Sequence, residues 1–235
     1  MKTMRFFRGT ILSVSLGALV ACSSFFVSDS YYGVKTGGKN IVFVIDISGS
    51  MEGRAEGNIS DQLRAQAAER LAGKVGSMIG GRIGGYVSSG IASETTKLAS
   101  AKRELKPAIM GLNETTRFTI VTFSDGVATW KDDLTVATKS DKAIGYAFVM
   151  NLSTQGGTSA MAGIARAFMV PGVDTIFFLS DGYPSDAGGD QIVEAVKAMN
   201  QGRGIQVNTI GLGDDKDEKF LKKLAKENGG KYIEG

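Results

Sequence analysis

The stretch IVFVIDISGSM, residues 41–51, decides the fold. Its first five residues are apolar without interruption, and the run then ends in the carboxylate of Asp46. A continuous apolar run of this length is typical of a strand that is buried on both faces, as in a parallel sheet between two layers of helices. Ser48 and Ser50 follow at alternate positions. The sequence therefore predicts a central buried strand that brings one carboxylate and two hydroxyls to the end of a sheet.

The rest of the chain alternates between strand-like and helix-like segments. Further apolar runs of strand length occur at residues 117–123, 174–180 and 205–212. Between and after them, apolar residues recur every three or four positions, as on one face of a helix. The expected helices cover residues 93–106, 139–150, 158–169, 190–200 and 217–230. This alternation predicts a doubly wound α/β domain with a mostly parallel sheet and helices on both faces.

Two shorter segments are expected at the edges of the sheet. The sequence Ser-Asp-Gly at residues 124–126 is a tight-turn signal, so residues 127–130 are expected to form one short antiparallel edge strand. Residues 231–235 are expected to form the last edge strand.

Composition excludes several classes of function. The 235 residues are 43% hydrophobic, which is enough for one substantial core. Histidine is absent, which argues against Ser-His and Cys-His catalysis. The net charge is +3, but Lys2, Arg5 and Arg8 account for it, since residues 1–21 contain no acidic residue. The remaining chain is neutral, and its composition therefore does not predict nucleic-acid binding.

The N-terminus has the pattern of a secretory signal. A basic start precedes a small, apolar run at residues 9–21, which is shorter than the roughly 20 residues of a spanning helix. The segment LVAC, residues 19–22, resembles the bacterial lipobox, whose cysteine becomes the lipidated first residue after cleavage. The resemblance implies a signal peptide at residues 1–21 and lipidation of Cys22. Because Ser23 rather than aspartate follows, it also implies export to the outer membrane. An uncleaved anchor or an incidental thiol is the alternative.

Polar side chains are expected to gather where the predicted strands end, since open α/β sheets bind ligands outside the carboxyl ends of their strands. The set comprises Asp46, Ser48 and Ser50 after the first strand, Thr158 in the loop QGGTS, and Asp181 after the strand at 174–180. Two carboxylates and three hydroxyls suit a hard divalent cation, Mg²⁺ or Mn²⁺ rather than zinc. The two negative charges balance this cation and leave it able to attract a further anion.

Glycines accompany this set of polar residues. Gly156 and Gly157 precede Thr158, and Gly182 follows Asp181. Without a Cβ, these positions are expected to let the backbone approach a shared point. Taken singly, the aspartates and serines fit helix caps and turns as well. The complete set favours a cation site.

The order and spacing of these residues resemble the von Willebrand factor type A (VWA) domain and its metal-ion-dependent adhesion site (MIDAS). The pattern of that site is Asp-x-Ser-x-Ser with a distant Thr and a distant Asp. The resemblance covers residues 39–235. It implies that Ser48, Ser50 and Thr158 contact the metal through hydroxyls, and that Asp46 and Asp181 hold it mainly through waters. It also implies a partner protein that supplies an acidic residue to the metal.

The sequence departs from this family at residues 52–92, where an insertion precedes the first expected helix. Residues 60–74 predict a helix. At residues 75–92 an apolar residue recurs every fourth position, each followed by a small residue, including Gly76, Gly80 and Gly84. Such a stripe resembles a glycine zipper, which lets another helix approach closely. Such a helix needs a packing partner or lipid, and the zipper is expected to pack on the preceding helix or on a second copy; a flexible glycine-rich loop is the alternative.

These observations predict a lipid-anchored VWA protein of the bacterial envelope, with residues 22–38 as a tether between lipid and domain. The main expected function is cation-dependent binding of a partner protein. The second is a structural or assembly lipoprotein that self-associates through residues 75–92. The third, a Mg²⁺-dependent hydrolase, is disfavoured because no general base accompanies the metal set and no phosphate-binding loop is present.

Overall fold

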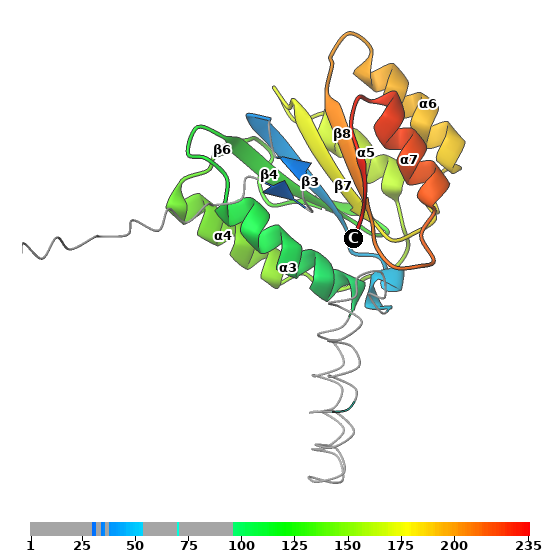
Figure 1. Cartoon of the computed structure of the whole chain (residues 1–235), viewed down its shortest axis with the longest axis horizontal. Coiled ribbons are helices and arrows are strands. Elements are labelled where there is room, and N and C mark those ends of the chain that lie inside the picture. The colour runs from blue at the N-terminus through cyan, green and yellow to red at the C-terminus, as the bar shows by residue number, and fades with distance from the viewer. Residues whose placement is uncertain (1–29, 32–33, 36–37, 54–69, 71–95) are drawn as a thin grey trace, which may run out of the picture.

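The computed structural model describes residues 30–31, 34–35, 38–53, 70 and 96–235. Within this part of the chain a seven-stranded sheet forms the centre of the domain, with strand order β5-β4-β3-β7-β8-β9 and with β6 also paired to β4 (Figure 1). The strands are β3 (Asn40–Asp46), β4 (Arg117–Phe123), β5 (Val127–Thr129), β6 (Thr135–Val136), β7 (Thr175–Ser180), β8 (Gln206–Gly211) and β9 (Tyr232–Glu234).

Pairing within the sheet is mostly parallel. Strand β3 lies between β4 and β7 and is parallel to both, and β7, β8 and β9 continue in parallel. Strands β5 and β6 both pair with β4 in the antiparallel sense, at the same edge. The predicted buried strands and the two predicted edge strands are confirmed, whereas β6 was not predicted.

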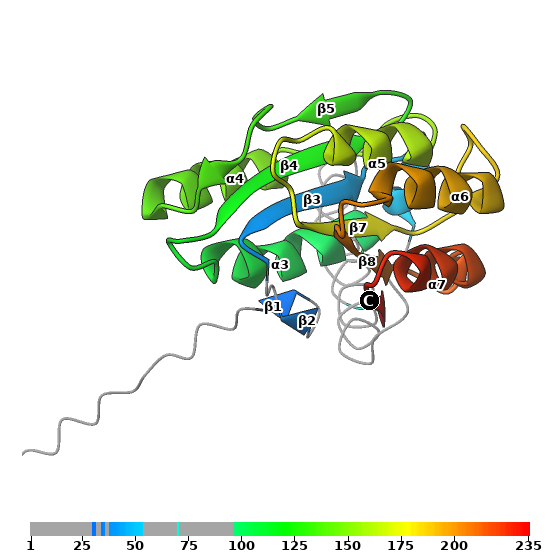
Figure 2. The ribbon, with the colours of Figure 1, turned by 90° about the horizontal axis from the view of Figure 1, so that it is seen from above.

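Helices cover both faces of the sheet (Figure 2). They are α3 (Lys97–Met110), α4 (Lys139–Met150), α5 (Ala160–Phe168), α6 (Gly189–Asn200) and α7 (Glu218–Glu227), with a short 3-10 helix η1 (Gly49–Glu52) after β3. Helices α3 and α4 lie on one face, and α5, α6 and α7 lie on the other. The predicted mostly parallel α/β architecture is therefore confirmed.

Side chains of β3 point alternately to the two faces of the sheet and contribute to the apolar core on each face. Phe43 packs on the α3–α4 side, where its ring stacks on Phe177 with a centroid distance of 5.7 Å. Val44 belongs to the core on the opposite side, where Phe123 and Phe178 stack at 5.4 Å. Successive residues of a strand point to opposite faces, so a strand between two helical layers must be apolar at every position.

Helix α3 begins four residues later than predicted. Thr96 caps it, because its hydroxyl oxygen accepts a hydrogen bond from Ala99 N at 3.1 Å. The helix continues through Pro107 to Met110, beyond the predicted end at residue 106. The backbone N–H of Lys97 donates to the carbonyl of Gly53 at 2.9 Å, so the start of the predicted insertion lies against the start of α3.

Several predicted features lie outside the described residues. They include the signal peptide, Cys22 and the zipper glycines Gly76, Gly80 and Gly84; of residues 54–95 only Arg70 is described, in helical conformation. Within the predicted tether, β1 (Ser30–Tyr31) and β2 (Val34–Lys35) form a short antiparallel pair. Among the helices that the structure describes, none is both long enough and apolar enough to cross a bilayer.

Candidate metal centre

The candidate site lies where the strand order reverses. From β3 the chain passes to β4 on one side and later crosses to β7 on the other, so the carboxyl ends of β3 and β7 flank a topological switch point. Ile45 is in register with Leu179, which brings Asp46 at the end of β3 level with Ser180 at the end of β7. Asp181 follows directly. The two carboxylates that the sequence predicts for one site therefore come from adjacent strands.

Asp46 is fully buried and both of its carboxylate oxygens are hydrogen-bonded. Oδ1 accepts from the backbone N–H of Ser48 at 2.8 Å, and Oδ2 accepts from the hydroxyl of Ser180 at 2.7 Å. Burial raises the pKa of Asp46 to about 6, and the nearby charge of Asp181 adds to the rise, while the hydrogen bonds from Ser48 and Ser180 lower it in part. The folded domain therefore holds this carboxylate ionised at neutral pH at an energetic cost.

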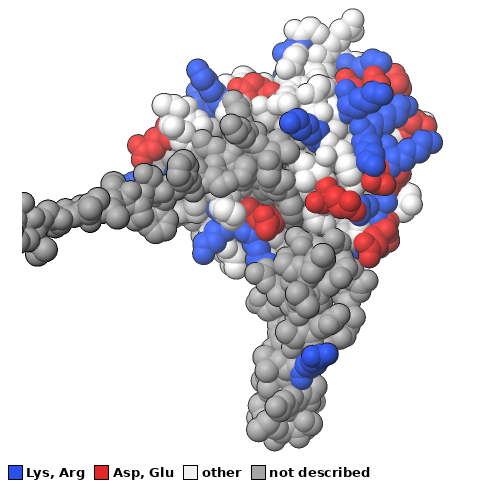
Figure 3. Space-filling model, in the orientation of Figure 1, with Lys and Arg blue, Asp and Glu red and all other residues white. Residues whose placement is uncertain are grey.

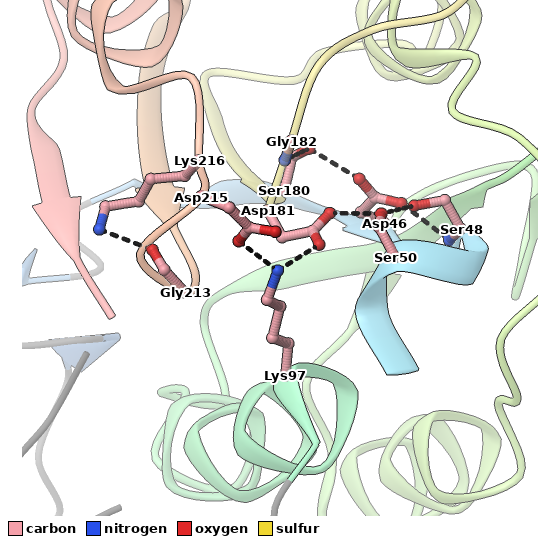
Figure 4. Close-up of polar contacts among 10 residues, drawn as sticks. All are labelled: Asp46, Ser48, Ser50, Lys97, Ser180, Asp181, Gly182, Gly213, Asp215 and Lys216. Carbon is pink, nitrogen blue, oxygen red and sulfur yellow. Dashed lines mark hydrogen bonds and ion pairs between the residues drawn. The ribbon is translucent and has the colours of Figure 1, made fainter. Parts of the chain in front are cut away.

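A chain of hydroxyls joins the end of β3 to Asp181 (Figure 4). The hydroxyl oxygens of Ser48 and Ser50 are 3.0 Å apart, and Ser50 Oγ donates to Asp181 Oδ1 at 2.9 Å. Local structure fixes both serines. They lie at the start of η1, which is anchored in the core by the fully buried side chain of Met51.

The loop that carries Thr158 is attached to the same region through its backbone. Gly49 N donates to the carbonyl of Gly156 at 3.0 Å, and Gln155 N donates to the carbonyl of Ile47 at 2.7 Å. Thr158 itself is nearly buried, and its backbone N–H donates to Ser185 Oγ at 3.0 Å. Among the described residues, no hydrogen bond joins its side chain to the other four members of the predicted set.

Asp125, which sequence reasoning missed, holds the glycine loop in place. Gly156 has a φ of +29°, and a Cβ there would lie 1.5 Å from Asp125 Oδ2. Gly157 N donates to Asp125 Oδ1 at 2.6 Å, and a Cβ on Gly157 would lie 2.7 Å from the same oxygen. Position 156 therefore favours glycine through its positive φ as well as its contacts, whereas a side chain at position 157 would have to displace the carboxylate of Asp125. A Cβ at Gly182 would meet open space, so the close approach expected there is not observed.

Lys97 and Ser180 are further members of the site that the sequence analysis did not identify. The Nζ of Lys97 lies 2.9 Å from Asp181 Oδ2 and 2.5 Å from Asp215 Oδ1 (Figure 4). Burial alone would lower the pKa of Lys97, but the hydrogen bonds to the two aspartates raise it above its ordinary value. Ser180 could have been found from the parallel register of β3 and β7. No local signal distinguishes Lys97 from the other lysines.

The chemistry of the donors matches a cation with oxygen ligands. Carboxylates and hydroxyls from the ends of β3 and β7 meet at the carboxyl end of the sheet, and hard divalent cations prefer such ligands. Within the described part of the chain, no group of three or more His, Cys, Asp or Glu side chains could hold a metal. A cation here would therefore depend on the serine hydroxyls and on waters as well as on Asp46 and Asp181.

The fold and this cluster define a doubly wound α/β domain with a polar centre at its switch point. The profile of the von Willebrand factor type A domain matches residues 87–233, and the chain belongs to this family. The match begins after the serine motif, so the position of Asp46, Ser48 and Ser50 in the family's pattern comes from their spacing and from the structure. Domains of this family mediate protein–protein interaction, often through a divalent metal at a MIDAS.

Curated relatives are much longer than this chain. The inter-alpha-trypsin inhibitor heavy chain H2 of Mus musculus is 26% identical over 206 residues, which cover 82% of this chain and 17% of that relative. The chain therefore spans less than a fifth of that relative's length.

Solved structures share the fold at low sequence identity. A von Willebrand factor type A protein from Catenulispora acidiphila has a TM-score of 0.60 at 20% identity, over 86% of this chain and 39% of that chain. Proximal thread matrix protein 1 from the mussel byssus, with a zinc-occupied MIDAS motif, has a TM-score of 0.52 at 17% identity. The shared region covers 83% of this chain and 41% of the mussel protein.

Proposed function

We propose that the chain is a lipid-anchored protein of the bacterial cell envelope that binds a partner protein through a divalent cation. One observation carries the proposal: Asp46, Ser48, Ser50 and Asp181 are joined by hydrogen bonds at the switch point of the sheet, through the backbone N–H of Ser48 and the two serine hydroxyls. In this proposal Ser48, Ser50 and Thr158 contact the cation through hydroxyls, and the two aspartates hold it mainly through waters.

The cation would be Mg²⁺ or Mn²⁺. The chain has no histidine, and the described side chains proposed as ligands at this centre offer only oxygen atoms, whereas zinc favours nitrogen and sulfur ligands. When bound, the cation supplies an open coordination position that an acidic side chain of the partner can fill. The residues of the chain hold the carboxylates and hydroxyls in place and shield Asp46 from water.

Binding fits the site better than catalysis. Both oxygens of Asp46 already accept hydrogen bonds, and its raised pKa follows from burial. We therefore propose that Asp46 has a role in holding the cation and not in proton transfer, and that the chain is not an enzyme.

A nucleic-acid partner is not proposed, because the described basic side chains on the face shown in Figure 3 are mixed with acidic ones. Lys and Arg gather over α6 and α7, but Asp and Glu are interspersed among them (Figure 3). Ion pairs join several of these charges: Lys197–Glu227 at 3.1 Å, Lys222–Glu218 at 2.6 Å and Lys223–Asp190 at 2.9 Å. A surface neutralised in this way gives little attraction to phosphates.

Affinity capture tests the binding function. The protein without its signal peptide, immobilised and incubated with envelope extract, is expected to retain at least one other protein in Mg²⁺ and to release it in EDTA. The variant Asp46→Asn is expected to retain none of it in Mg²⁺, because it lacks one of the two carboxylates that balance the cation.

The second candidate, assembly through residues 75–92, predicts a different result from the same experiment. Capture of the chain by itself, equal in Mg²⁺ and in EDTA, would favour assembly. Retention of the same foreign proteins by the wild type and by Asp46→Asn would contradict the binding proposal.

Lipid anchoring is tested at Cys22, which lies outside the described residues. When the full chain is expressed in a Gram-negative host, the wild type is expected to partition into detergent and Cys22→Ala into the aqueous phase, because only the thiol can carry the lipid. Ser23→Ala is the matched control and is expected to partition like the wild type. Equal partitioning and equal mature mass of wild type and Cys22→Ala would exclude the anchor.

A further inference from the structure

Lys97 is a buried cation that touches the candidate metal centre. It is the first residue of α3, its side chain is 4% exposed, and its ammonium lies between Asp181, which is also buried, and Asp215, whose side chain is 73% exposed. A buried ammonium is costly unless it is paired and hydrogen-bonded. Lys97 meets this condition through a carboxylate that belongs to the metal set.

The backbone around Lys97 is shaped to admit its side chain. Gly213, in the loop between β8 and α7, has a φ of +77°, and a Cβ at this position would lie 2.4 Å from Lys97 Cε. The backbone N–H of Lys97 is held by the carbonyl of Gly53. The ammonium therefore has a fixed position, unlike that of a lysine on the surface.

The two oxygens of Asp181 face different partners. Oδ1 accepts from the hydroxyl of Ser50, on the side of the serine motif, and Oδ2 accepts from Lys97 (Figure 4). A divalent cation held by the serines would lie on the Oδ1 side. The carboxylate of Asp181 would then interact with that cation and with the ammonium of Lys97 at the same time. Because both are positively charged, Lys97 would repel the cation.

Lys97 changes the net charge of the centre, both with and without a divalent cation. Asp46 and Asp181 carry two negative charges and Lys97 carries one positive charge, so the three buried groups have a net charge of −1 without metal. A divalent cation changes this to +1. Without Lys97 the same centre would change from −2 to neutral. The negative charge of Asp215 offsets the positive charge of Lys97 only partly, because water screens an exposed carboxylate.

We propose that Lys97 is a fixed countercharge of this centre, which lowers its affinity for the divalent cation and raises the affinity of the loaded centre for an acidic ligand. The proposal rests on the proposed function and adds Lys97 as a residue that sets the net charge of the metal centre. It explains why a lysine, with its strongly hydrated charge, is buried beside a site that has to attract a cation.

Binding of Mn²⁺ to the full chain in detergent tests the proposal, with free Mn²⁺ followed by electron paramagnetic resonance. Lys97→Met keeps a similar stem and removes the charge. It is expected to bind Mn²⁺ about tenfold more tightly than the wild type, since a like charge near the ion is removed. Acetate, added to the Mn²⁺-loaded proteins at constant ionic strength and followed by water-proton relaxation, is expected to bind Lys97→Met about tenfold more weakly.

Two further variants complete the test. Lys216→Met is the control, and Asp215→Asn tests the same charge effect if Lys97→Met does not fold. Lys216→Met also removes a buried ammonium, but that Nζ contacts Gly213 O and Glu234 rather than Asp181, so Mn²⁺ affinity should stay within about threefold of the wild type. Asp215→Asn alters an exposed side chain and keeps the fold. It removes a negative charge beside Lys97 and is expected to weaken Mn²⁺ binding about threefold.

The outcomes separate this proposal from the proposed function. If the wild type binds Mn²⁺ and Lys97→Met binds it equally or more weakly, Lys97 has only a structural role and the countercharge proposal is wrong. If neither protein binds Mn²⁺, the metal centre and the countercharge both fail. If Lys97→Met alone binds Mn²⁺, the countercharge holds and Lys97 replaces the metal in the wild type.

Discussion

Asp46→Asn is expected to stabilise the metal-free protein by about 3 kcal/mol at pH 7, because it removes a buried charge that folding holds at a cost. Burial raises the pKa of Asp46 from 3.8 to about 6 in the folded state. The folded state therefore binds more protons than the unfolded state between about pH 4 and pH 6, and this group's contribution makes the metal-free wild type less stable as the pH rises through that window. The gain from Asn is expected to be largest at pH 7 and to disappear near pH 4.

The same substitution is expected to abolish the stabilisation of the folded protein by Mg²⁺. Asn keeps the size of Asp46 and can still accept from Ser48 N, but it brings no negative charge to the cation. Urea unfolding at pH 7 and pH 5, in EDTA and in Mg²⁺, measures both effects. Asp133→Asn, at an exposed loop position, changes the same formal charge and is expected to leave both unchanged within about 0.5 kcal/mol. A destabilised variant at pH 7, or one that Mg²⁺ still stabilises, would contradict this account of Asp46.

Phe178→Ala is expected to lower the free energy of unfolding by about 3–5 kcal/mol. Phe178 is fully buried at the centre of β7; its ring stacks on Phe123 and meets the edge of Phe220 with a centroid distance of 6.5 Å. Its removal leaves a cavity between the sheet and α7 that the rigid strands cannot close. Because Asp181 follows β7, Mg²⁺ binding is expected to weaken as well.

Urea unfolding in EDTA checks the effect of Phe178→Ala. Met169→Ala is the control, since that side chain is 73% exposed, and a change of less than about 0.5 kcal/mol is expected for it. A loss below about 1 kcal/mol for Phe178→Ala would mean that β7 does not form the centre of this core.

Much of the fold could be predicted because the central strands are buried on both faces. Such strands leave continuous apolar runs, and β4 has the predicted bounds Arg117–Phe123. Strand β6 has only two residues, and no periodicity can be detected over that length. The start of α3 was misplaced by four residues, because its cap, Thr96, stands in a run of polar residues that could each serve as a cap.

The site could be predicted where it depends on strand ends. Asp46 and Asp181 follow strands that the apolar runs reveal, and the parallel sheet brings them together. Lys97 could not be found in this way. Its contact with Asp215 needs the start of α3 and the β8–α7 loop to meet, and these segments are more than a hundred residues apart in the chain. Such long-range contacts follow from the tertiary fold and leave no local pattern.

Titration of Mg²⁺ into the metal-free protein, followed by calorimetry, tests the central claim most directly. Saturable binding at one site is expected, together with a thermal unfolding midpoint that rises with Mg²⁺ concentration, because a ligand that binds only the folded state stabilises it. Asp46→Asn is expected to show neither effect. A wild-type protein that shows no saturable heat and no shift of its midpoint at millimolar Mg²⁺ or Mn²⁺ would contradict the claim that Asp46, Ser48, Ser50 and Asp181 form a cation site.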